Sequence, residues 1–452
     1  MANTIHTFRD HLLSVFQSAT EEIAHGLAGS EPVAGARLLS ENANVHAAAA
    51  LCTMREQGIQ EIPVAAPPGI AGDAWECTRL AFRLLEARVK GDQAQIDTIE
   101  SELTDSPCDP GWAETIVTYT EFFGPDGKAR AVPYVLPDTN AVDDAITIPN
   151  AARIALFADW GTGTPAAVEL MRQIKQQNPD ILVHLGDVYY AGTPDECERN
   201  FRAIIDTVFN RRQTDIPLYN MTGNHDMYCG GKGFYDQIGS LNASQEQRQK
   251  ASYFCLRTEN RKWQLLGMDT GLNDRDPWTV SDDVTHLEDD EETWHLRRIA
   301  EAADGQTVLL SHHQLFSAFS HIGPAGADGM HNPCNPKLLA SLRKFQATGN
   351  IAAWFWGHEH NLCIYQPYAG LSFGRCIGHS AVPVMTNHNP YTVPTTIADA
   401  PALIPNTQLS IQDQVFAHGF VMISLDGEGG PAKVEYFESN LGDIPLYTEN
   451  IG

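Results

Sequence analysis

Residues 153–187 read RIALFADWGTGTPAAVELMRQIKQQNPDILVHLGD, and this stretch decides the fold. Its two ends, 153–158 and 181–185, are short apolar runs of the kind that form buried, parallel strands. Between them Thr164 can cap a helix that starts at Pro165, and apolar residues follow at helical spacing. The stretch therefore predicts a strand-helix-strand unit of a parallel sheet.

Each strand of this unit leads into an aspartate, Asp159 after the first and Asp187 after the second. Neighbouring parallel strands place their carboxyl ends side by side, so both side chains should project into one crevice at the sheet edge. Two carboxylates that converge repel each other unless a cation lies between them. The pair therefore predicts a cation site.

Composition limits the class of protein. The chain has 452 residues, of which 43% are hydrophobic and 19% charged, enough for a large core and for two or more domains. Its net charge of −27, from 30 Lys+Arg against 57 Asp+Glu, opposes binding to phosphate backbones or anionic membranes. We therefore expect no nucleic acid as a stable partner. No run approaches the roughly 20 apolar residues of a transmembrane segment.

The cysteines and the first residues bear on the compartment. The nine cysteines are scattered and form no paired CxxC set, which favours a reducing environment. The first ten residues lack the basic start and apolar stretch of a secretory signal. We therefore expect a cytoplasmic protein, although a leader removed from the natural chain would reverse that expectation.

Three regions follow from the apolar patterns. Residues 1–110 are expected to form a helical region, residues 111–150 a β-hairpin and linker, and residues 151–452 the catalytic domain. Helical spacing is found at 5–26, 33–57, 73–90 and 92–104, and the hairpin strands are expected at 115–119 and 129–135. Beyond the opening unit, strands are expected near 216–222, 251–257, 263–269, 306–311, 351–356, 362–369, 414–425 and 432–438, and helices near 194–209 and 286–303.

Metal-ligand side chains recur after three further apolar runs. The segments are Gly223-Asn224-His225-Asp226, Ser311-His312-His313 and Gly357-His358-Glu359-His360. In an extended segment, alternation sends His358 and His360 to the same side, so one loop can reach two ions. Mixed carboxylate, amide and imidazole ligands suit borderline or hard cations rather than soft ones. The sequence thus predicts a site that joins several strand ends.

These segments, with Asp159-Trp160-Gly161 and the run from Gly186 to Tyr190, resemble the calcineurin-like metallophosphoesterase superfamily over about residues 150–380. The resemblance implies an α/β fold, a four-layer α/β/β/α sandwich of two packed mixed sheets flanked by helices, with the N-terminal helical region added. Gly161 stands where most members carry a histidine ligand, and Tyr190 follows Asp187 by three residues. That combination resembles the purple acid phosphatases, in which a tyrosinate favours ferric iron.

The resemblance also implies a ligand set for two metal ions. The first ion would be bound by Asp159, Tyr190 and His360, the second by Asn224, His312 and His358, and Asp187 would bridge them. It implies Fe³⁺ at the Tyr190 site and Fe²⁺, Zn²⁺ or Mn²⁺ at the second. An alternative places His313 in the role of His312; otherwise His313 is free to contact substrate.

The implied function is a binuclear phosphomonoesterase that attacks a small phosphorylated substrate with a metal-activated hydroxide. The alternatives are a phosphodiesterase acting on cyclic nucleotides or other diesters, and a scaffold that keeps the fold without metals. His225 would steady the transition state or protonate the leaving oxygen, with Asp226 orienting it, unless His225 only makes a structural hydrogen bond. His321, His331 and His379 are further candidates in loops, and the oligomeric state is open.

Overall fold

The computed structural model describes residues 93–104, 118–119, 122–123, 131–132, 134 and 144–452, except 245, 276–283, 385, 387–388 and 413. The chain separates into two compact units, residues 1–127 and 128–452. The predicted helices at 5–26, 33–57 and 73–90 lie outside the described residues, and the expected domain boundaries at 110 and 150 stay predictions. Among the described residues, no helix is long and apolar enough to cross a membrane.

In the first unit, helix α5 (Gln93–Thr104) confirms the helix expected at 92–104. Residues 118–119 and 122–123 are also helical, where the sequence predicts the end of a hairpin strand and the turn that follows it. Tyr119 and Phe123 explain the difference, because both are buried and their ring centroids lie 4.9 Å apart. In a helix, residues four apart lie on one face within contact distance of each other. In a strand they would lie about 13 Å apart, too far for their rings to touch.

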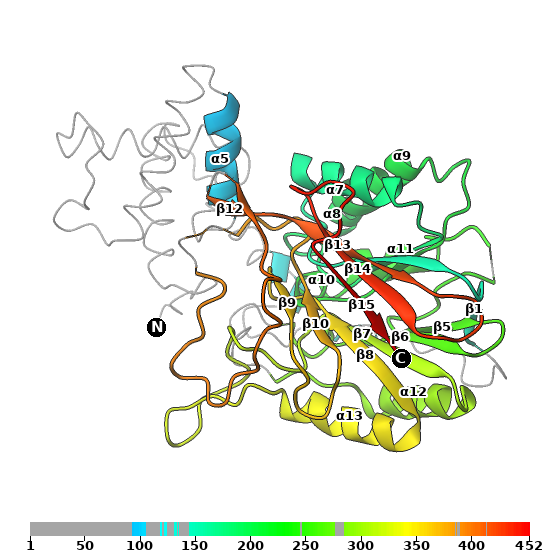
Figure 1. Cartoon of the computed structure of the whole chain (residues 1–452). Helices are drawn as coiled ribbons and strands as arrows, with labels where there is room; N and C mark the ends of the chain where they lie inside the picture. The colour runs from blue at the N-terminus through cyan, green and yellow to red at the C-terminus, as the bar shows by residue number, and fades with distance from the viewer. Residues whose placement is uncertain are drawn as a thin grey trace, which may run out of the picture. The chain divides into compact units, whose positions relative to one another are not determined.

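The described strands of the second unit form two large mixed sheets (Figure 1). One has the order β1-β5-β6-β7-β8-β10-β9 and the other β15-β14-β13-β2-β3-β4, and β11 pairs with β12 separately. The bounds of the first sheet's strands are β1 Ile146–Ile148, β5 Phe254–Thr258, β6 Trp263–Gly267, β7 Gln306–Ser311, β8 Asn350–Trp356, β10 Gly374–Ile377 and β9 Leu362–Ile364. Those of the second sheet are β15 Tyr447–Ile451, β14 Ala432–Glu438, β13 Gly419–Ser424, β2 Arg153–Phe157, β3 Ile181–His184 and β4 Leu218–Asn220, and the small pair is β11 Ile411–Gln412 and β12 Val415–Phe416.

Helices cover the outer face of each sheet, which gives four layers. The bounds are α7 Pro165–Gln176, α8 Pro194–Glu196, η1 Cys197–Arg202, α9 Ala203–Phe209, α10 Asn224–Met227, α11 Lys232–Ile238, α12 Asp289–Glu301 and α13 Pro336–Thr348. One buried cluster joins the two sheets through side chains such as Leu156 and Val308. A second holds Met171 of α7 against one outer face, and a third holds Leu342 of α13 against the other. The expected α/β/β/α sandwich is confirmed.

The opening strand-helix-strand unit forms as predicted. Thr164 caps α7 by accepting a hydrogen bond from the amide of Ala167, and the buried face of the helix carries Leu170, Met171 and Ile174. Strands β2 and β3 are parallel, with Phe157 opposite His184. Because the two strands end side by side, the loops that follow them begin next to each other.

The other sheet brings a second pair of loops to the site. Strands β7 and β8 are parallel and end together, with Ser311 opposite Trp356. The amide of Gly357 donates to the carbonyl of His312 at 2.9 Å, which joins the two loops directly after the strands. The histidine-bearing segments therefore start from adjacent points.

Candidate metal centre

Three of the predicted site residues have a left-handed backbone. The φ angles are +56° at Asp159, +71° at Asp187 and +67° at His358. Non-glycine residues adopt this conformation at a cost of about 1–3 kcal/mol, and they do so most often where a side chain must be aimed into a functional site. All three lie just beyond strand ends, so the turns direct their side chains toward one point.

The two aspartates lie buried at that point. Asp187 Oδ2 lies 3.3 Å from His312 Nε2, and the three side chains of Asp159, Asp187 and His312 place one ligand atom each within 4.8 Å of one another. Burial raises the pKa of Asp159 to about 8, with the charge of Asp187 adding to the rise and His312 opposing it. Burial also raises the pKa of Asp187, but His312 and His225 outweigh that effect and hold it well below its ordinary value.

An amide and two imidazoles complete one side of the cluster. Asn224 Oδ1 lies 3.0 Å from His358 Nδ1 and 3.2 Å from His312 Nε2, and its amide nitrogen donates to Tyr228 at 2.6 Å. His312 Nδ1 lies 3.0 Å from the carbonyl oxygen of Leu185. Since that carbonyl can only accept, Nδ1 carries a proton, and Nε2 faces the oxygens of Asp187 and Asn224.

The other side of the cluster holds His360 and a tyrosine. His360 Nε2 lies 3.6 Å from Asp159 Oδ1, and the hydroxyl of Tyr189 lies 3.0 Å from His360 Nε2. The same hydroxyl is 3.1 Å from Asp159 Oδ1 and 3.3 Å from Asp187 Oδ2. The structure therefore brings Tyr189 to the position that the sequence analysis assigned to Tyr190.

The backbone around Val188 is irregular at this point. Val188 forms a parallel bridge with Gly161 and is fully buried in the cluster under α7, whereas Asp187 has a φ of +71° and Tyr189 lies in the turn that follows. The amide of Tyr190 donates to Glu196 at 2.5 Å, and its carbonyl lies 2.6 Å from His225 Nδ1. Burial raises the pKa of the Tyr189 phenol well above its usual range, and the carboxylates of Asp159 and Asp187 raise it further.

His225 and Asp226 contact different partners from those expected. His225 packs between Tyr189 and Tyr228, with ring centroids 4.5 Å and 4.9 Å away, and its Nε2 lies 3.8 Å from Asp187 Oδ2. The carboxylate of Asp226 accepts from the amides of Gly223 at 2.8 Å and Asp187 at 2.9 Å. Asp226 thus joins the two loops that carry Asp187 and Asn224, and it is the carbonyl of Tyr190 that contacts the His225 ring, in place of the expected Asp226.

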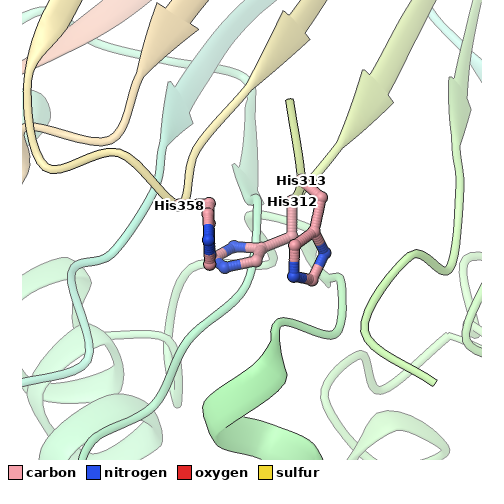
Figure 2. A group of neighbouring side chains, drawn as sticks. All are labelled: His312, His313 and His358. Carbon is pink, nitrogen blue, oxygen red and sulfur yellow. The ribbon is translucent and has the colours of Figure 1, made fainter. Parts of the chain in front are cut away.

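The two adjacent histidines, drawn with His358 in Figure 2, have distinct hydrogen-bond partners. His313 Nε2 lies 2.8 Å from Asp274 Oδ2, and its Nδ1 lies 3.1 Å from the hydroxyl of Thr270. His312 faces the carboxylates, whereas both ring nitrogens of His313 are engaged by residues after β6. Of the two alternatives left open by the sequence, the geometry favours His312 as the residue that faces a metal.

The remaining histidines differ in position. His321 borders a small cavity together with His313, His358 and Asp274, and its ring stacks on that of His331 at a centroid distance of 3.8 Å. His379 is fully buried, with its Nε2 only 2.5 Å from where a side chain on Gly419 would begin. His321 therefore lies near the cluster, whereas the contact with strand β13 indicates a packing role for His379.

Comparison with known proteins identifies the domain. Residues 152–362, which include every predicted site residue, match the family model described as calcineurin-like phosphoesterase. The chain therefore carries a calcineurin-like phosphoesterase domain over these residues. This domain makes the protein a phosphoesterase, a hydrolase of phosphate esters.

Sequence relatives of this phosphoesterase are acid phosphatases. Tartrate-resistant acid phosphatase type 5 of Mus musculus is 25% identical over 249 residues, which cover 49% of this chain and 70% of the mouse protein. The Homo sapiens protein of the same name is 25% identical over 248 residues, covering 49% and 71%. Over about half of its length the chain is thus similar to acid phosphatases of the purple acid phosphatase-like branch.

Solved structures also align with this phosphoesterase. The structure of GAP50, described as the anchor in the inner membrane complex of Plasmodium, aligns with a TM-score of 0.42. That alignment has 10% sequence identity and covers 67% of this chain and 88% of the other.

The phosphoesterase thus gathers most of the predicted residues at one point and adds three that the sequence analysis missed. Tyr189, Thr270 and Asp274 belong to the second group. Tyr189 lies in a turn directly after Val188, where the sequence pattern gives no signal of its direction. Thr270 and Asp274 follow β6 without a recognisable motif, and their partner His313 is about 40 residues away in the chain.

Proposed function

We propose that this phosphoesterase hydrolyses small phosphate monoesters at a centre of two metal ions. The observation that carries the proposal is the convergence of two buried carboxylates, an amide oxygen, three imidazoles and a phenol at one point. Among the described residues, neither Asp159 nor Asp187 has a lysine or arginine within 4.0 Å. Buried carboxylates need a compensating charge, and these donors fit hard or borderline cations.

The geometry supports a revised assignment of ligands. The first ion would be bound by Asp159, Tyr189 and His360, the second by Asn224, His312 and His358, with Asp187 shared. We propose Fe³⁺ for the first site, since a phenolate is a hard ligand, and Fe²⁺, Zn²⁺ or Mn²⁺ for the second. Bound ions would supply a water of lowered pKa as the nucleophile and would neutralise the phosphate oxygens.

We propose His225 as the protein group that contacts the leaving oxygen. The carbonyl of Tyr190 fixes its Nδ1 as the proton-bearing nitrogen, so Nε2 is directed toward the side of Asp187. The flanking rings of Tyr189 and Tyr228 keep the imidazole in this plane. We propose that the doubly protonated ring donates a hydrogen bond from Nε2 to a phosphate oxygen or to the leaving oxygen.

A comparison of two chromogenic substrates tests the proposal. Protein reconstituted with Fe³⁺ and Zn²⁺ is assayed with an aryl phosphate monoester and the matching diester, from about pH 4 to about pH 9. We expect preferential hydrolysis of the monoester. Preference for the diester would move the protein to the phosphodiesterase alternative, and no hydrolysis of either ester by protein that binds both ions would favour the scaffold.

A further inference from the structure

Residues 269–274 lie outside every motif, yet they contact the loop that carries Asn224. Asp269 Oδ1 accepts a hydrogen bond from the hydroxyl of Thr222 at 2.5 Å. A Cβ atom on Gly271 would come within 2.5 Å of the carbonyl oxygen of Gly223, so the two backbones pass very close to each other. This segment therefore abuts the turn between Thr222 and Asn224.

The same segment holds the ring of His313 by both nitrogens. The hydroxyl oxygen of Thr270 accepts from the backbone amide of His313 at 3.0 Å and lies 3.1 Å from Nδ1. Asp274 Oδ2 lies 2.8 Å from Nε2. Since Thr270 can donate its own proton to Nδ1 while accepting from the amide, Nε2 carries the proton that Asp274 accepts. The contacts fix both the tautomer and the plane of the ring.

The fixed ring packs against two of the residues assigned to the second ion. The ring centroids of His313 and His358 lie 4.5 Å apart with an interplanar angle of 39°, and those of His313 and His312 lie 4.9 Å apart at 86° (Figure 2). His312 and His313 are buried and His358 is partly buried, and one nitrogen of each lies within 4.8 Å of the others. A displacement of the His313 ring would open space beside the imidazole of His358.

We propose that Thr270 and Asp274 are positioning residues for the second metal ion, which they support by holding His313 against His358. The inference rests on the proposed two-metal function and deepens it. The described hydrogen bonds of Thr270 and Asp274 do not include Asp159, so their loss should weaken one ion and spare the other. Residues that contact and orient metal ligands without contacting the metal itself typically contribute about 10–100-fold to metal affinity.

Calorimetric titration of metal-free protein with Zn²⁺ alone tests this inference. In Asp274→Leu, we expect one of two dissociation constants to rise by about 10–100-fold while the other stays unchanged. Thr270→Val, which keeps the shape and removes the hydroxyl, should weaken the same site. Asp274→Asn should retain the affinity to within about threefold, because its amide oxygen can accept from Nε2.

Ile322→Val is the matched control, since Ile322 borders the same cavity as Asp274 and is also buried. Wild-type affinity at both sites in Asp274→Leu and Thr270→Val would overturn the inference. If Asp274→Leu does not fold, Thr270→Val decides the matter by itself. A wild-type protein that binds two ions and hydrolyses no phosphoester would overturn the proposed function alone, because the titration does not depend on turnover.

Discussion

A methyl group added at Gly223 would collide with two side chains of the metal centre. A Cβ atom there would lie 2.0 Å from Asp187 Oδ1 and 2.8 Å from His312 Nε2. The backbone itself would accept alanine, because φ at Gly223 is −104°. To reach an ordinary contact of 3.4 Å, the carboxylate of Asp187 must move by about 1.4 Å.

A shift of about 1 Å in a positioned catalytic group costs on the order of 10²-fold in rate. We therefore expect Gly223→Ala to lower kcat for an aryl phosphate by at least about 10²-fold and to lower the metal content of the purified protein. Rates are measured on reconstituted protein, and metal is measured by elemental analysis of the same sample.

Gly239→Ala is the control for this experiment. Gly239 ends α11 with φ of −67°, and no atom lies within 4 Å of the position where its Cβ would be built. The control should retain full activity and both ions. Wild-type rates and metal content in Gly223→Ala would refute the placement of Asp187 between the two proposed sites.

Three further predictions concern the ligands and the fold. On iron-loaded protein, Tyr189→Phe should abolish the tyrosinate-to-iron visible band and Tyr190→Phe should keep it; the reverse result would restore the sequence-based assignment. Asp187→Ala and His358→Ala should each abolish turnover and deplete metal, and full activity with normal metal in either would contradict the site. Burial of His184 lowers its pKa from 6.5 to about 4. Because the unfolded chain binds this proton more readily, the free energy of unfolding should fall by about 3 kcal/mol as the pH drops from 6.5 to below about 4. Urea unfolding at a series of pH values measures this free energy. Its dependence on pH should be weaker for His184→Phe than for the wild type, and an identical dependence would assign the loss to other groups.

The parts of the fold that follow local rules could be predicted from the sequence. The unit around α7 has a capping threonine, a proline at the first helical turn and apolar strands on both sides, so each local preference agrees with the final structure. The aspartates and histidines at strand ends were identified for the same reason. Helix α13 was missed although Asn335 and Pro336 give it an equally clear start.

Elements stabilised by distant partners could not be read from local patterns. Strand β10 carries Arg375, a charged residue that is fully buried because Glu449 of β15 forms an ion pair with it at 2.7 Å. Neither residue alone suggests a buried strand. The same limit applies to Asp274 and His313, whose contact depends on two strands lying side by side.

The choice between Tyr189 and Tyr190 depended on the backbone path around Val188, which the sequence does not show. Spacing relative to the family pattern favoured Tyr190, whereas in the structure the hydroxyl of Tyr189 contacts Asp159 from the turn after the bridge between Gly161 and Val188. Gly161 permits this bridge, because a Cβ atom there would come within 2.8 Å of the Cα of Val188.

A crystal structure of the metal-loaded protein, with the ions located by anomalous scattering, tests the central claim most directly. The account predicts two ions that share Asp187, with Tyr189 on the first and Asn224 and His312 on the second. A single ion, or two ions that do not both contact Asp187, would contradict it.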